Sequence, residues 1–132
     1  MQEELIITKP YIQYEKRFLN SLYPTFDLES LVKTIKENFT WKDEKLNAIS
    51  LLKSREKSLI LFAIKQDTEI QASQLDNSIV IQVLDGKIEL YLKREIIQIP
   101  KGQALTFYKK TKYKLIAQEE AVVLLTINRN NY

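Results

Sequence analysis

The sequence predicts a mainly β protein with a helical segment ahead of the strands, and three observations lead to this prediction. From residue 41 onward, apolar residues come in short runs separated by polar turn residues, a pattern typical of sandwiches and barrels. Before residue 41, one stretch has the apolar spacing of a helix. There is no sequence repeat and no linker-like segment. We therefore expect one domain over 1–132, with one or two helices in an extension over 1–40 and a β-barrel over 41–132.

The first predicted element is a helix that begins after Asp27. Aspartate is a favoured N-cap because its carboxylate accepts hydrogen bonds from the first turn. The apolar residues that follow are spaced by three, four and seven and form one stripe: Leu28, Leu31, Val32, Ile35 and Phe39. Residues 5–7 could form a short strand, and residues 14–22 could form a second helix that Pro24 ends.

Eight β-strands are predicted after residue 40. A polar hairpin turn over 53–57 separates the first two strands, and Asp85-Gly86 is a strong turn signal after the third. The fourth strand alternates clearly, with Ile88, Leu90 and Leu92 on one face. The predicted strands cover residues 46–52, 59–64, 79–84, 87–92, 95–99, 104–108, 113–118 and 122–127.

The composition removes several kinds of chemistry. The chain has no histidine and no cysteine, so it lacks the commonest general base, the commonest metal ligand and any thiolate nucleophile. Its only two glycines, Gly86 and Gly102, exclude a glycine-rich phosphate loop. An enzyme built on this chain would have to use Asp, Glu, Lys, Tyr, Ser or Thr.

Charge and hydropathy bear on partners and location. Twenty basic residues against seventeen acidic ones give a net charge of +3, too mild and too scattered for a nucleic-acid footprint. The densest basic stretch, residues 108–114, is interpreted as a turn and the solvated face of a strand. No apolar run approaches the ~20 residues that cross a bilayer. We expect no nucleic-acid partner, no membrane association and, without cysteines, a cytoplasmic protein.

Two sequence segments carry a resemblance to a known family. Residues 79–86 form an apolar strand that runs into a Leu-Asp-Gly turn, and fifteen residues later Gly102 opens a second segment through Phe107. Residues 121–127 match a closing strand, and residues 26–54 look like a helix and strands that precede a barrel. This pattern resembles small single-domain bacterial cupins. The resemblance implies a cupin-like double-stranded β-helix, or jelly-roll barrel.

The sequence departs from the cupin pattern at the metal ligands. Aligned on Gly86, the two histidines and the glutamate of the first cupin motif fall on Ser73, Leu75 and Ile79. Aligned on Gly102, the histidine of the second motif falls on Tyr113, or on Leu105 if Pro100 and Gly102 are matched instead. These residues cannot replace three imidazoles and a carboxylate. We therefore expect no metal and no other cofactor.

The same alignment defines a candidate cavity. Strand alternation sends Ile79 and Ile81 inward from one strand and Tyr113 and Leu115 from another. The candidate ligand-binding residues are Ser73, Leu75, Ile79, Ile81, Tyr113 and Leu115. The interior is either a pocket for a small, partly apolar molecule or a core filled by side chains. A ligand that enters between Ser73 and Tyr113 is expected to be uncharged or weakly polar, because none of the four motif positions offers a cation.

Three functions remain open on these residues. The first is a non-catalytic, metal-free cupin-like protein that binds a small molecule. The second is a cofactor-free enzyme that uses Tyr, Ser or Lys, although no catalytic residue is assigned. The third is a structural interaction module. We also expect a homodimer, because the segment with Leu5, Ile6, Ile7, Tyr11 and Tyr14 is more apolar than a free tail should be.

Overall fold

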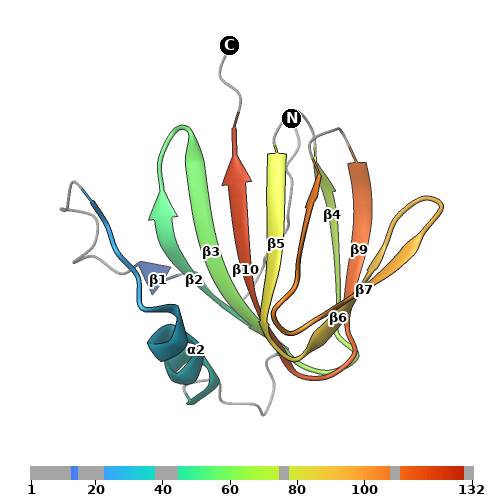
Figure 1. The fold of residues 1–132 in the computed structure, drawn as a ribbon, viewed down its shortest axis with the longest axis horizontal. Helices are drawn as coiled ribbons and strands as arrows, with labels where there is room; N and C mark the ends of the chain where they lie inside the picture. Colours follow the sequence, from blue (N-terminus) through green and yellow to red (C-terminus); the bar gives the residue numbers. More distant parts are fainter. Residues whose placement is uncertain (1–12, 15–22, 38–44, 75–77, 108–110, 130–132) are drawn as a thin grey trace.

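The computed structural model describes residues 13–14, 23–37, 45–74, 78–107 and 111–129. Within them are one α-helix and ten β-strands (Figure 1). The helix is α2 (Leu28–Glu37). The strands are β1 (Gln13–Tyr14), β2 (Leu46–Lys53), β3 (Lys57–Ile64), β4 (Glu69–Gln74), β5 (Ser78–Asp85), β6 (Lys87–Tyr91), β7 (Ile96–Pro100), β8 (Ala104–Phe107), β9 (Thr111–Ala117) and β10 (Ala121–Asn128).

The strands form two sheets that face each other (Figure 1). One sheet has the order β1-β2-β3-β10-β5-β8 and the other has the order β4-β9-β6-β7. All strand pairs are antiparallel except β1 with β2. Because β10 lies between β3 and β5, and β9 between β4 and β6, the chain crosses repeatedly from one sheet to the other. This is the jelly-roll arrangement, and the predicted mainly β class is confirmed.

The eight predicted strands are all present within two residues of their expected ends. The exposed or partly exposed positions alternate with buried ones, as in β5 and β6. Strand β4 was not predicted from its pattern, because Gln71, Ser73 and Gln74 make it too polar. The helix predicted over 14–22 is wrong at Tyr14, which pairs with Ser50 in a parallel strand. The rest of that helix and the strand predicted over 5–7 lie outside the described residues.

Helix α2 begins where the sequence predicts. The Ser30 N–H donates a hydrogen bond to Asp27 Oδ1 at 3.1 Å, so Asp27 is the N-cap. The apolar stripe of the helix packs on the outer face of the six-stranded sheet, where Ile35 is buried. The sheet residues beneath it are Leu51, Leu61, Ala63, Val122 and Leu124. Phe39, the last residue of the predicted stripe, lies outside the described residues.

A salt bridge also joins the helix to the sheet. Lys36 Nζ donates to Asp85 Oδ2 at the end of β5. This hydrogen bond raises the pKa of Lys36 above its usual value, although partial burial acts in the opposite direction. Lys101 approaches the other oxygen of the same carboxylate, at 3.8 Å. Asp85 therefore lies between two cations on different elements.

The main hydrophobic core lies between the two sheets. It contains the inward positions of β5 and β9 that alternation predicted, including Ile79, Ile81, Tyr113 and Leu115. The four-stranded sheet contributes Ile88, Leu90 and Ile99, and the six-stranded sheet contributes Phe62, Val123 and Leu125. The core therefore extends through the whole interior that the described strands enclose.

The turn at Asp85-Gly86 is a corner at which the chain leaves the six-stranded sheet for the four-stranded one. Gly86 has a φ of +80°, which L-residues with a side chain rarely adopt. A Cβ at this position would lie 2.3 Å from the carbonyl oxygen of Glu120 and 2.7 Å from Cα of Ala121. Gly102 has a similar φ of +89°, but a Cβ there would meet no atom within 4 Å. Glycine is therefore favoured at 86 both by the positive φ and by the close backbone atoms. At 102 it is favoured by the positive φ alone.

Candidate functional site

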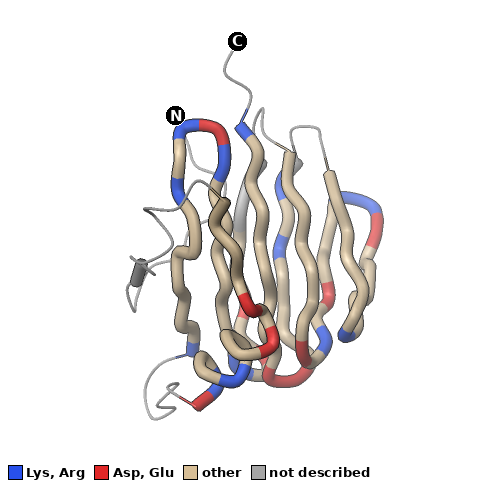
Figure 2. Tube along the Cα trace, turned by 60° about the vertical axis from the view of Figure 1, so that its left-hand side comes forward, with Lys and Arg blue, Asp and Glu red and all other residues tan. Residues whose placement is uncertain are grey.

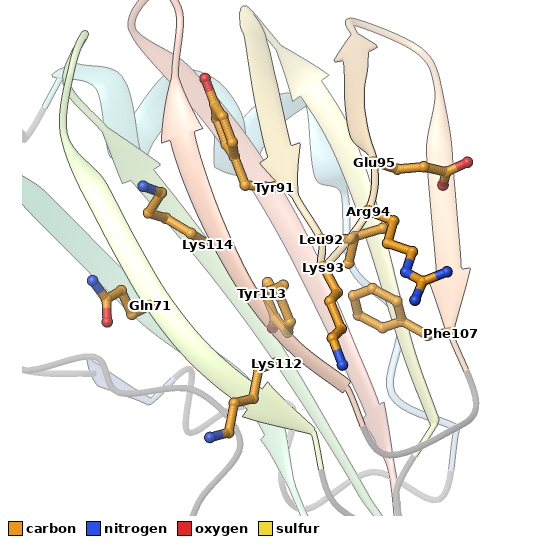
Figure 3. A pocket seen from close by; sticks show the side chains of 10 residues that line it. All are labelled: Gln71, Tyr91, Leu92, Lys93, Arg94, Glu95, Phe107, Lys112, Tyr113 and Lys114. Atoms are coloured by element: carbon orange, nitrogen blue, oxygen red, sulfur yellow. The ribbon is translucent and has the colours of Figure 1, made fainter.

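An open pocket forms where the ladder between β6 and β9 ends. The last paired residues are Tyr91 on β6 and Lys114 on β9. Beyond them β6 turns back into β7, and the Leu92 N–H donates to the Glu95 carbonyl at 2.8 Å. Strand β9 extends further, to Thr111, alongside β4. The resulting gap is a pocket of about 1100 Å³ between the β6–β7 turn, the end of β8 and the start of β9 (Figure 3).

The base of the pocket is apolar and aromatic. Phe107, the last residue of β8, and Tyr113 on β9 line it, and their rings lie 5.0 Å apart at 41°. Both residues also belong to the main core, and Leu92 packs against that core from the turn. The pocket therefore ends on the packed interior of the barrel.

The rim of the pocket carries mostly cationic side chains. Lys93 and Arg94 come from the β6–β7 turn, and Lys112 and Lys114 come from β9 (Figure 3). Glu95 is the acidic residue of this lining. Figure 2 marks the charged residues along the chain trace, and most of them lie in the turns, with few along the strands.

Tyr91 and Gln71 complete the rim beside Lys114. Lys114 Nζ lies over the Tyr91 ring, 5.0 Å from its centroid, at the distance of a cation–π contact. The Tyr91 hydroxyl donates to Glu89 Oε1 at 2.8 Å. This hydrogen bond raises the pKa of Tyr91 because it favours the protonated phenol. Tyr91 is therefore a hydrogen-bond donor rather than a base.

The structure places the predicted site residues in two groups. Ile79, Ile81 and Leu115 are buried in the core and do not line the pocket, whereas Tyr113 is 5% exposed and does. In the β4–β9 ladder, Ser73 pairs with Lys112, and Tyr113 pairs with Ala72. Leu75 lies outside the described residues.

Tyr113 is the one lining residue that was among the candidate ligand-binding residues; the other nine were not: Gln71, Tyr91, Leu92, Lys93, Arg94, Glu95, Phe107, Lys112 and Lys114. A signal for them was present in the order of the strands. Because strands alternate in direction, the turn after β6 and the end of β8 lie at the same end of the barrel as the start of β9. The basic residues of the β6–β7 turn and of the start of β9 could therefore have been assigned to the same end of the barrel.

The residues present do not fit the metal that a cupin usually holds. Ile79, at the motif glutamate position, is fully buried in the hydrophobic core. Across the described ranges, no group of three or more His, Cys, Asp or Glu residues could hold a metal ion. The chain as a whole has no histidine and no cysteine. No step of chemistry is therefore assigned to a metal at this site.

We predict that the purified, untagged protein contains far less than one transition metal per chain. The physical reason is that isoleucine offers no ligand atom and a neutral phenol is a poor one. Elemental analysis checks the content, and the melting temperature should not change when a chelator is added. A stoichiometric metal together with a lower melting temperature in chelator would contradict the prediction.

Comparison with known proteins identifies the fold. No family model matches the sequence, and no curated protein matches it. Solved structures do match. A cupin superfamily protein from Desulfitobacterium hafniense has a TM-score of 0.63 at 10% identity, covering 67% of this chain and 82% of that one. An RmlC-like cupin protein from Desulfovibrio desulfuricans has a TM-score of 0.58 at 22% identity, covering 67% and 86%.

A third structure is the cupin domain of an XRE family transcriptional regulator from Enterobacter cloacae. Its TM-score is 0.61 at 8% identity, covering 67% of this chain and all of that domain. These similarities and the jelly-roll topology define the fold class of the described strands. This chain has the cupin fold, as the sequence motifs predicted. Among the described residues, no helix is long and apolar enough to cross a membrane.

Proposed function

We propose that this chain is a non-catalytic, metal-free cupin-fold protein that binds a small, partly apolar molecule at the open end of its barrel. The observation that supports this is the pocket whose base is Leu92, Phe107 and Tyr113 and whose rim is polar. Ligand sites typically combine apolar walls with a few polar groups that orient the ligand.

The proposal places the ligand at the mouth of the barrel and not in its centre. The centre of the barrel is packed with core side chains, which include Ile79, Ile81 and Leu115. The sequence left open whether the interior is a pocket or a filled core. We propose that the interior is a filled core and that the ligand pocket lies at its open end. We further propose that the protein is cytoplasmic.

A cofactor-free enzyme is the second candidate, and two observations weigh against it. Lys112 is exposed and Tyr113 is buried, so these neighbours face opposite sides of β9 and do not form an acid–base pair. The hydrogen bond to Glu89 raises the pKa of Tyr91, whereas a tyrosine base needs a lowered one.

The third candidate is a structural homodimer, for which the apolar residues between Leu5 and Tyr14 are the proposed interface. Most of this segment lies outside the described residues. Light scattering at micromolar concentration tests the proposal, since a mass of 15.6 kDa would mean a monomer and would remove it.

Binding is tested with phenylnaphthylamine, a neutral aromatic probe whose fluorescence rises in apolar surroundings. The wild-type protein should bind it, and Leu92→Ala should weaken binding by about tenfold because apolar contact is lost at the base. Leu84→Ala is the matched control, since Leu84 is also half-buried but packs in the cluster under α2. Circular dichroism establishes that both variants are folded. Failure of the wild type to bind, or equal loss in both variants, would contradict a ligand site at the mouth.

A further inference from the structure

We infer that the ligand of this pocket carries an anionic group, such as a carboxylate or a phosphate, joined to an apolar body. This inference rests on the proposed function and names the class of ligand. The apolar body would lie on Phe107 and Tyr113, and the anionic group would face the rim. It revises the expectation of an uncharged ligand, which considered only the four motif positions and not the turn that lies beside them.

The first argument is the charge of the rim. Its lining has four cationic side chains, Lys93, Arg94, Lys112 and Lys114, against the one carboxylate of Glu95. The whole chain is close to balanced, with twenty basic and seventeen acidic residues. The pocket is therefore much more cationic than the protein average, and a surface of one sign attracts ligands of the other.

The second argument is that the exposed cations of this rim have no anionic partner within the described residues. The ion pairs among the described residues are Lys36–Asp85 and Lys101–Asp85. Both lie at the end of β5 that is away from the pocket. Glu95 forms no salt bridge with Lys93 or Arg94, although all three are in the same turn. A ligand anion would consequently not have to displace an existing ion pair.

The third argument is geometric. Lys93 and Arg94 follow Leu92 directly in the β6–β7 turn and are both exposed, whereas Lys112 and Lys114 project from the face of β9 opposite to buried Tyr113. In Figure 3 the side chains of Lys93 and Arg94 lie beside Phe107, whereas those of Lys112 and Lys114 point away from them. An anionic group beside the β6–β7 turn can receive charge-assisted hydrogen bonds from Lys93 and Arg94 while the apolar body lies on Phe107.

The experiment compares two probes that differ by one anionic group. Anilinonaphthalene sulfonate is phenylnaphthylamine with a sulfonate on the ring. At low salt the sulfonate should bind on the order of tenfold more tightly than the neutral probe. This advantage should shrink as salt is raised, because exposed charges are screened within about 8 Å at physiological ionic strength.

A pair of variants locates the effect. Lys93→Gln with Arg94→Gln should lower the ratio of the sulfonate affinity to the neutral-probe affinity by about three- to tenfold. The matched control, Lys53→Gln with Arg55→Gln, removes one lysine and one arginine from the exposed β2–β3 turn and should change neither affinity.

The outcomes separate the two proposals. Equal affinity for both probes, with binding of the neutral probe still dependent on Leu92, would overturn the anionic ligand and leave the binding site standing. Absence of Leu92-dependent binding for both probes would overturn the proposed function itself. Equal loss in the control variant would show that the preference comes from overall charge, and would also overturn the inference.

Discussion

Replacement of Gly86 by alanine is expected to destabilise the fold by on the order of 3 kcal/mol or more. The left-handed backbone at this corner costs a residue with a Cβ about 1–2 kcal/mol. The new methyl group would in addition overlap the Glu120 carbonyl and Ala121 Cα, which are backbone atoms at the start of β10 and cannot rotate away. The corner or β10 must therefore shift, and β10 pairs with both β3 and β5.

Gly102→Ala is the matched control for this prediction. Its φ is also in the left-handed region, but a Cβ there meets no atom within 4 Å. It should therefore cost only the conformational part, about 1–2 kcal/mol. Urea denaturation of the three proteins gives the free energies of unfolding. If Gly86→Ala and Gly102→Ala are equally stable, the close contact with Glu120 is not a constraint on this fold.

Replacement of Tyr113 by alanine is expected to cost roughly 3–5 kcal/mol of stability, as truncation of a buried aromatic residue does. Tyr113 is 5% exposed, belongs to the main core and contacts the Phe107 ring. Its removal would leave a cavity beneath the pocket and take away half of the aromatic base. Phenylnaphthylamine binding, measured where the variant is still folded, should also weaken.

Tyr23→Ala provides the comparison for Tyr113. Tyr23 is 83% exposed, so its loss should change the free energy of unfolding by less than about 0.5 kcal/mol. Thermal and urea unfolding measure both variants. A Tyr113→Ala protein as stable as Tyr23→Ala would mean that the aromatic base of the pocket is not part of the core.

Most of the fold followed from the sequence because local patterns determine it. The alternation of Ile88 and Leu90 with Lys87 and Glu89 matches β6, which buries one face and exposes the other. Asp27 and the apolar stripe after it gave helix α2. The sequence could not show which strands pair, because pairing of β10 with β3 and β5 depends on contacts between distant residues. Only the resemblance to cupins supplied that arrangement in advance.

Less of the candidate site could be predicted. Motif spacing identified Tyr113, which lines the pocket, and also Ile79, which the core covers. Motif spacing gives the positions that correspond to the metal ligands of the cupin pattern but not how far the neighbouring ladder extends. The pocket exists because β6 turns back at Leu92 while β9 continues to Thr111. Leu92, Lys93 and Arg94 become site residues through that difference in length, which no local pattern records.

The packing of α2 has a practical consequence for anyone who wishes to isolate the barrel. A division after residue 40 would remove Ile35 and its helix from Leu51, Leu61 and Val122, which are buried beneath it. It would also remove β1 and leave the hydrogen-bonding edge of β2 open. Exposed apolar patches and unpaired edges promote aggregation. A shortened protein that starts at residue 41 is therefore expected to be poorly soluble. In the whole chain, α2 covers the apolar outer face of the six-stranded sheet and β1 pairs with the edge of β2.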